Sequence, residues 1–96
     1  MTTTSEGQRR RVTIANQRGL HARASAKFVG MVARLPEGTS VRVVREAFEA
    51  AGGSILGLMM LGAAKGDEIE IITFGPDAAD ALHQLCTLVE DRFGEE

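Results

Sequence analysis

The feature of this chain that most constrains its fold is a hydrophobic pattern whose period changes repeatedly along the sequence. Apolar and polar residues alternate in three segments, residues 10–15, 40–44 and 68–74. Such alternation is typical of half-buried strands. Residues 47–50 form a fourth, shorter candidate strand that ends at a pair of glycines. We therefore predict four strands in a chain of 96 residues, which is long enough for one domain.

Between these strands the pattern takes the period of a helix. Residues 22–35 place an apolar stripe on one face, and Pro36 ends that helix. Ser54 is a preferred N-cap and predicts a short helix over residues 55–61. Gly75-Pro76-Asp77 predicts the start of a last helix, with proline at its first helical position. That helix is expected to end before Gly94 and to bury Ala78, Leu82, Leu85, Val89 and Phe93.

The resulting order is strand, helix, strand, strand, helix, strand, helix. It predicts an α+β fold in which three helices cover one face of a mostly antiparallel four-stranded sheet. We expect residues 1–8 to be a disordered start and residues 9–96 to form a single domain. No apolar stretch approaches the roughly 18 residues that span a bilayer, and the polar first residues do not resemble a signal peptide. These features predict a soluble, cytoplasmic protein that does not bind a membrane.

Charge is distributed unevenly, although the formal net charge is only −2. Through Leu35 the chain has seven basic residues and one acid, a balance of +6, and from Pro36 onward four basic residues and twelve acids, a balance of −8. A basic N-terminal half suits an acidic partner or a phosphate, but the same clustering also arises on ordinary solvated surfaces. Arg9, Arg10 and Arg11 are open to the same two interpretations.

Two residue types are informative because they are rare. The single cysteine, Cys86, excludes an internal disulfide and a multi-cysteine metal site, so we expect no metal and no cofactor. Cys86 falls near the apolar stripe of the last helix and is expected to be a small buried hydrophobe. Of the two histidines, His83 falls on the polar side of that helix and is expected to be a surface residue.

The other histidine, His21, stands where a glycine-containing loop meets the start of a helix. The first backbone N–H groups of a helix lack intrahelical partners, and the helix dipole favours negative charge there. A neutral imidazole offers a nucleophilic nitrogen, and Arg23 can donate two parallel hydrogen bonds to a phosphate. Spacing alone leaves open the alternative of an ordinary cap or surface histidine.

The stretch Gly19-Leu20-His21-Ala22-Arg23 resembles the active-centre motif of the HPr phosphocarrier family. A second motif of that family resembles residues 54–61, and a third resembles Gly66-Asp67. The resemblance extends from about Arg10 to Phe93. It implies an HPr-like open-faced β-sandwich with the element order βαββαβα, which is also the order that the hydrophobic pattern predicts.

The resemblance implies a role for each active-centre residue. His21 would accept a phosphoryl group on its δ nitrogen from phosphorylated enzyme I, which phosphoenolpyruvate charges. Arg23 would neutralise the phosphate, and the backbone amides of Ala22 and Arg23 would hold it. An enzyme IIA-type partner would then receive the phosphoryl group, so the chain would be a carrier with a phosphohistidine intermediate and not an independent catalyst. Ala24 stands where the family usually has proline.

The resemblance also implies a regulatory site and a docking surface. Ser54 matches the serine that HPr kinase/phosphorylase phosphorylates in some members, although a plain N-cap explains a serine here equally well. A phosphate at Ser54 would add close to two negative charges beside apolar residues and weaken docking of a partner. The residues expected at the docking surface are Leu20, Ser54, Ile55, Leu58, Met59 and Met60.

Other functions stay open at this stage. One is a regulatory binding module in which a non-transport protein recognises the phosphorylation state of His21 or Ser54. The segment Ala22-Arg23-Ala24-Ser25 resembles the nitrogen-related branch of the family, whose outputs are regulatory. Binding to nucleic acid is disfavoured because the chain has only four aromatic residues and a net negative charge. A carrier that hands on its cargo through transient interfaces is expected to be a monomer.

Overall fold

The computed structural model describes residues 7–95 and has the predicted order of elements. The elements are β1 (Gln8–Thr13), α1 (Ala22–Ala33), β2 (Ser40–Arg45), β3 (Phe48–Ala51), α2 (Ile55–Met60), β4 (Glu68–Phe74) and α3 (Ala78–Glu90), followed by a 3₁₀ turn, η1 (Arg92–Gly94). A disordered start was predicted for residues 1–8, and residues 1–6 of that segment lie outside the described residues. Gln8 already belongs to β1.

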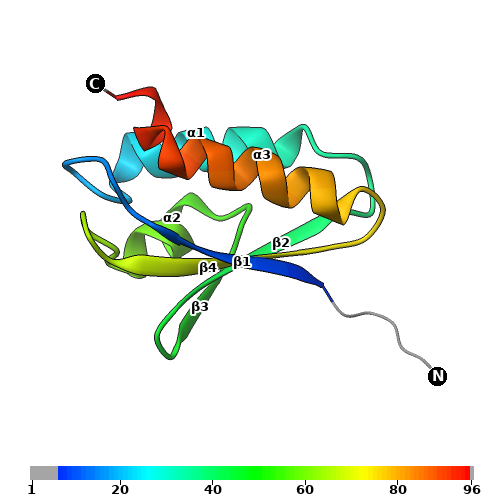
Figure 1. Ribbon diagram of the computed structural model, residues 1–96, viewed down its shortest axis with the longest axis horizontal. Coiled ribbons are helices and arrows are strands. Elements are labelled where there is room, and N and C mark those ends of the chain that lie inside the picture. Colours follow the sequence, from blue (N-terminus) through cyan, green and yellow to red (C-terminus); the bar gives the residue numbers. More distant parts are fainter. Residues whose placement is uncertain (1–6, 96) are drawn as a thin grey trace.

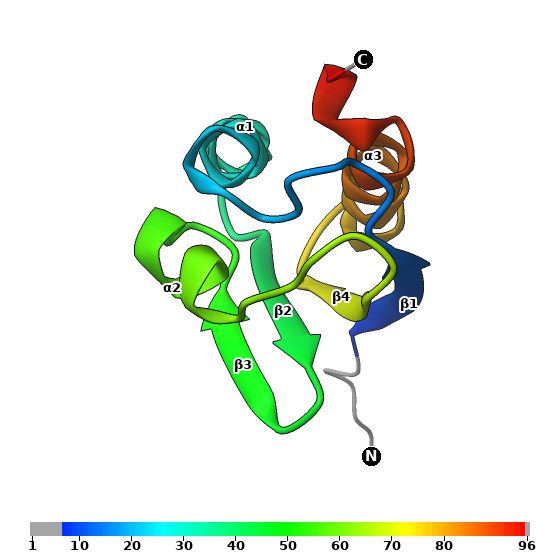
Figure 2. The same cartoon turned by 90° about the vertical axis from the view of Figure 1, so that its left-hand side faces the viewer.

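The four strands form one sheet in the order β1-β4-β2-β3, and every neighbouring pair is antiparallel. All three helices lie on the same side of this sheet: α1 and α3 run side by side across it, and α2 packs against β3 and α1 (Figures 1 and 2). The predicted α+β architecture is confirmed.

The two faces of the sheet differ because strand residues alternate in direction. The face under the helices carries the apolar residues that pack on α1 and α3, among them Val12, Val43, Ile69 and Ile71. The open face carries charged pairs, Arg9 with Glu70, Arg11 with Glu68 and Arg42 with Glu49. Two of the three N-terminal arginines are therefore paired within the sheet.

The start of α3 differs from the prediction. Asp77 has a left-handed backbone (φ +58°), so the helix begins at Ala78 and Pro76 is not its first residue. The cause is the tight turn before it: Gly75 has φ +101°, and a Cβ there would lie 2.3 Å from the Gly38 carbonyl oxygen. Contact with the neighbouring loop thus overrides the local preference of proline for a first helical turn.

The end of the last helix is also earlier than predicted. α3 ends at Glu90, and Phe93 lies beyond it with a left-handed backbone (φ +56°), although its side chain is fully buried as expected. Ala78 is only half-buried. His83 is exposed and Cys86 is buried, as predicted, and burial raises the pKa of the Cys86 thiol.

Within residues 7–95, none of the helices has the length and apolar character needed to cross a membrane. The same part of the chain holds no group of three or more His, Cys, Asp or Glu side chains placed to bind a metal ion.

Candidate functional site

The loop between β1 and α1 is held against the turn before β4. Gly19 has φ +64°, and a Cβ on it would lie 2.4 Å from the Ala63 carbonyl oxygen. The next backbone N–H, of Leu20, donates to that same oxygen at 3.0 Å. Only glycine allows this close approach. The loop therefore delivers the following residue, His21, to a defined position at the start of α1.

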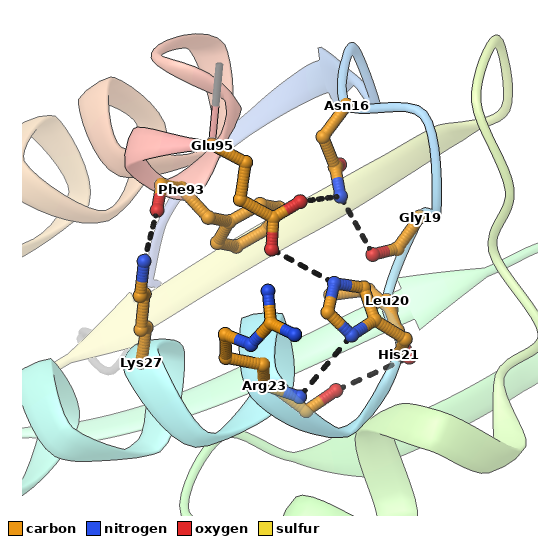
Figure 3. A network of polar contacts seen from close by, with 9 residues as sticks. Asn16, Gly19, Leu20, His21, Arg23, Lys27, Phe93 and Glu95 are labelled. Carbon is orange, nitrogen blue, oxygen red and sulfur yellow. Dashed lines mark hydrogen bonds and ion pairs between the residues drawn. The ribbon is translucent and has the colours of Figure 1, made fainter.

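His21 is the N-cap of α1, and its two ring nitrogens face different partners (Figure 3). Nδ1 accepts a hydrogen bond from the backbone N–H of Arg23 at 3.3 Å. Nε2 lies 2.8 Å from a carboxylate oxygen of Glu95. A backbone amide can only donate and a carboxylate can only accept, so these partners place the proton on Nε2 and leave Nδ1 unprotonated, with its lone pair accepting from the Arg23 amide. The side chain of His21 is 14% exposed.

Glu95 is itself fixed by a second contact. Its other carboxylate oxygen accepts from the side-chain amide of Asn16 at 3.1 Å, and that amide also donates to the Gly19 carbonyl at 2.9 Å. Loss of hydration raises the pKa of the Glu95 carboxyl, but hydrogen bonds from His21 and Asn16 and the charges of His21 and Arg23 outweigh it and lower the pKa. Glu95 is therefore ionised at neutral pH.

The end of the chain reaches His21 because it folds back after α3. Arg92 and Phe93 both have left-handed backbones, and Phe93 is buried in the core. The Lys27 ammonium group on α1 donates to the Phe93 carbonyl at 2.7 Å (Figure 3). This contact fastens the turn η1 to α1, and Glu95 follows directly after it.

The two other residues expected at the active centre lie at the first turn of α1. Ala22 and Arg23 are exposed, and their amides belong to the N–H groups that a helix start leaves without intrahelical partners. The guanidinium of Arg23 points toward the Glu95 carboxylate (Figure 3). The start of α1 thus combines an unprotonated ring nitrogen, the amides of the first helical turn and a cation.

Ser54 is the N-cap of α2, and its hydroxyl oxygen accepts from the backbone N–H of Gly57 at 2.9 Å. Exposed apolar side chains follow it, and we call them the α2 apolar patch: Ile55, Leu56, Met59 and Met60. Leu56 was not among the residues predicted for docking, yet it is 67% exposed.

Two predicted docking residues are not on this surface. Leu20 and Leu58 are only 5% and 1% exposed, and both belong to the hydrophobic core. Leu58 occupies the inner face of the two-turn helix α2, and the Leu20 side chain packs under the loop that precedes α1. Neither side chain contributes exposed area to the α2 apolar patch.

The sequence did not indicate Asn16, Lys27 or Glu95 as site residues. Glu95 is 74 positions from His21, and Phe93 is 66 positions from Lys27. No periodic pattern relates residues so far apart. The one local signal is Asn16, a turn-forming residue three positions before Gly19.

Comparisons with known proteins show the family of this chain. The family model for the PTS HPr component phosphorylation site matches residues 8–91. Phosphocarrier protein HPr of Pseudomonas aeruginosa is 45% identical over 85 residues, which are 88% of this chain and 92% of that protein. Phosphocarrier protein NPr of Shewanella violacea is 37% identical over 86 residues, with 90% and 92% covered.

A solved structure supports the same assignment. The crystal structure of an HPr from Thermoanaerobacter tengcongensis matches with a TM-score of 0.85 and 31% sequence identity, covering 93% of this chain and 98% of that one. The chain belongs to the HPr family, the phosphocarrier component of bacterial phosphotransferase systems.

Proposed function

We propose that His21 accepts a phosphoryl group on Nδ1 from phosphorylated enzyme I and passes it to an enzyme IIA-type acceptor. The observation that carries this proposal is the pair of contacts on the ring, Arg23 N–H on Nδ1 and Glu95 on Nε2. The Arg23 amide releases the Nδ1 lone pair. That lone pair attacks phosphorus while the bond from phosphorus to the donor nitrogen breaks, and the electron pair of the broken bond returns to the donor. Because Nδ1 carries no proton, the transfer needs no general base.

Charge is balanced around the phosphorylated ring. With phosphorus on Nδ1 and the proton kept on Nε2, the ring carries a positive charge that the Glu95 carboxylate offsets. The phosphoryl oxygens face the first turn of α1, where the amides of Ala22 and Arg23 and the Arg23 guanidinium are available to donate. Phosphoryl transfer needs mainly such positioning and charge stabilisation. Glu95 acts as a positioning residue that keeps the ring in the required tautomer.

The direct test is incubation with enzyme I and labelled phosphoenolpyruvate, followed by measurement of acid-labile, base-stable label on the chain. His21→Ala is expected to abolish the label. His83→Ala is the matched control, because it removes the only other histidine, from an exposed helix position, and should leave labelling unchanged. Label on the His21→Ala variant, or none on the natural chain with an enzyme I active on a related HPr, would contradict the proposal.

Onward transfer distinguishes the sugar-uptake output from the nitrogen-related one. The phosphorylated chain would be mixed with a sugar-specific enzyme IIA and with a nitrogen-related enzyme IIA, and the initial transfer rates compared. Faster transfer to the nitrogen-related acceptor would support the resemblance of residues 22–25 to that branch. Since phosphoenolpyruvate is an intracellular metabolite, we place the carrier in the cytoplasm.

We propose Ser54 as a second, regulatory phosphorylation site for an HPr kinase/phosphorylase. Its position beside the α2 apolar patch supports this, because a phosphate there adds close to two negative charges next to exposed Ile55 and Met59. The chain would be incubated with that kinase and a nucleotide donor and then weighed by mass spectrometry. One phosphate on the natural chain and none on Ser54→Ala is the expected result, and an unmodified natural chain would exclude the site.

A further inference from the structure

A pocket of about 590 Å³ lies beside the His21 site. Its walls come from four parts of the chain: the loop before α1, α1 itself, the turn before β4, and the turn η1 with the residues after it. Its charged lining consists of five cations and one carboxylate, Arg18, Arg23, Lys27, Lys65, Arg92 and Glu95. Five positive charges less one negative charge leave a balance of +4.

Within the described part of the chain these five cations form no ion pair, a feature that they share with Arg10 and Arg34. Ion pairs form at Arg9, Arg11, Arg42 and Arg45. The Arg23 guanidinium points toward the Glu95 carboxylate (Figure 3). Glu95, the one carboxylate in the lining, is engaged by His21 and Asn16. Gathering like charges in a concave surface is unfavourable without a counter-charge, and a concave wall focuses their field on an anion.

We propose that this pocket binds a small molecule that carries two or more phosphate or carboxylate groups. Cations from four segments surround the space, so one ligand with several anionic groups can contact more of them than a single phosphate can. Lysine binds such groups as a point charge, and arginine binds them through two parallel, bidentate hydrogen bonds. The volume is in the range that small-molecule ligands occupy.

The pocket adjoins the place of the transferred phosphoryl group and shares Arg23 with it, but the two do not coincide. Nδ1 of His21 faces the first turn of α1, whereas the pocket borders the Glu95 carboxylate that contacts Nε2, and His21 is not part of its lining. It is also distinct from the α2 apolar patch, none of whose residues lines it. A concave, polar site without exposed apolar residues suits a small anion better than a protein surface.

The test measures binding of pyrophosphate and of inorganic phosphate to the whole, unphosphorylated chain by calorimetry. Pyrophosphate is expected to bind at least about tenfold more tightly than phosphate, and more weakly as salt is raised. Arg18→Gln and Lys65→Gln should each weaken pyrophosphate binding about tenfold, as expected for one charge-assisted hydrogen bond. Arg34→Gln is the matched control, because it removes an exposed charge at the other end of α1. This variant should bind pyrophosphate as tightly as the natural chain.

Amide chemical shifts on adding pyrophosphate give a second measurement, with the largest changes expected at Lys65 and Gly94. Shifts confined to His21 and Ala22, which do not line the pocket, with equal affinity for phosphate, would place the anion at the phosphoryl position and overturn the proposal. An equal loss of pyrophosphate affinity in Arg34→Gln would show that the anion responds to the overall positive charge and not to this pocket. Binding that does not saturate by about 10 mM pyrophosphate would exclude the site. Binding of an acidic peptide without pyrophosphate would assign the pocket to a protein partner instead. None of these measurements requires phosphoryl transfer, so the result is independent of the proposed function.

Discussion

The helices α1 and α2 are both capped at their first turn by a side chain, but by residues of different type. Each helix begins with backbone N–H groups that lack partners, and in each the side chain of the preceding residue accepts from one of them. At α2 the acceptor is the Ser54 hydroxyl at 2.9 Å, and serine is among the best caps. At α1 it is a ring nitrogen of His21 at 3.3 Å, and histidine is not a preferred cap. The cap position of α1 thus holds a weaker capping residue than that of α2, but one with an unprotonated ring nitrogen.

The surroundings of the two caps differ as much as the caps themselves. His21 lies among polar groups, with Glu95 on one ring nitrogen and an amide on the other. Ser54 opens onto exposed apolar side chains. A negative group added at His21 therefore meets amides and cations, while one added at Ser54 disturbs an apolar surface. The same covalent change is expected to have opposite consequences at the two helix starts.

The largest effect on stability is expected where the loop to His21 approaches the turn before β4. Gly19→Ala should lower the free energy of unfolding by about 3 kcal/mol, because the new methyl group meets the Ala63 carbonyl oxygen and φ is +64°. Denaturant unfolding measures the change. Gly62→Ala is the matched control, since it has φ +67° but open space around the new methyl, and should cost about 1 kcal/mol. Equal losses would show that the carbonyl contact is not the cause.

Ser54→Ala sharpens the comparison at the α2 cap. Removing the hydroxyl that accepts from Gly57 should lower the free energy of unfolding by about 1 kcal/mol. Thr87→Ala removes a hydroxyl from an exposed position on α3 and should stay within about 0.5 kcal/mol of the natural chain. A Ser54→Ala variant as stable as this control would mean that the serine is not needed as a cap.

His21→Asn tests whether α1 gives up stability for chemistry. Asparagine is a preferred N-cap, so its stronger cap should offset the lost contact with Glu95 and keep stability within about 0.5 kcal/mol. Labelling from phosphoenolpyruvate should nevertheless be abolished, because the nucleophilic nitrogen is gone. A loss of more than about 2 kcal/mol would show instead that the imidazole is mainly structural.

The smallest effect is expected from Glu95→Gln, and it should depend on pH. The folded state lowers the pKa of Glu95, so its ionised form stabilises the fold above its unfolded pKa, about 4.3, and this contribution is lost as pH falls through the lowered folded pKa. The melting temperatures of the natural chain and the variant should differ at pH 7 and converge in acid. Glu37→Gln, at an exposed position, should show no such convergence. Parallel curves for Glu95→Gln would exclude an ionic role for this carboxylate.

Local patterns in the sequence were sufficient for the order of elements, the sheet class and the cap positions of His21 and Ser54. Strand alternation and the helical stripe each depend on neighbours no more than four positions apart, and that is the range over which a backbone conformation imposes its period. A cap and the backbone amide that donates a hydrogen bond to it also lie within this range of sequence separation. These local patterns placed His21, Arg23 and Ser54 at helix starts, and the resemblance of residues 19–23 and 54–61 to the HPr motifs indicated their roles.

The remaining features depend on how those elements pack. Glu95 reaches His21 because η1 folds back and is held by Lys27, and Asp77 departs from the helix because Gly75 meets a neighbouring loop. The five pocket cations come from segments spread between Arg18 and Arg92, in both the basic and the acidic half of the sequence. A contact across 74 positions leaves no repeating pattern along the chain, because its geometry is set by the burial of the sheet and helices between its ends. The sequence motif therefore indicated the proposed nucleophile, whereas its carboxylate partner and the proposed anion pocket arose only from the folded arrangement.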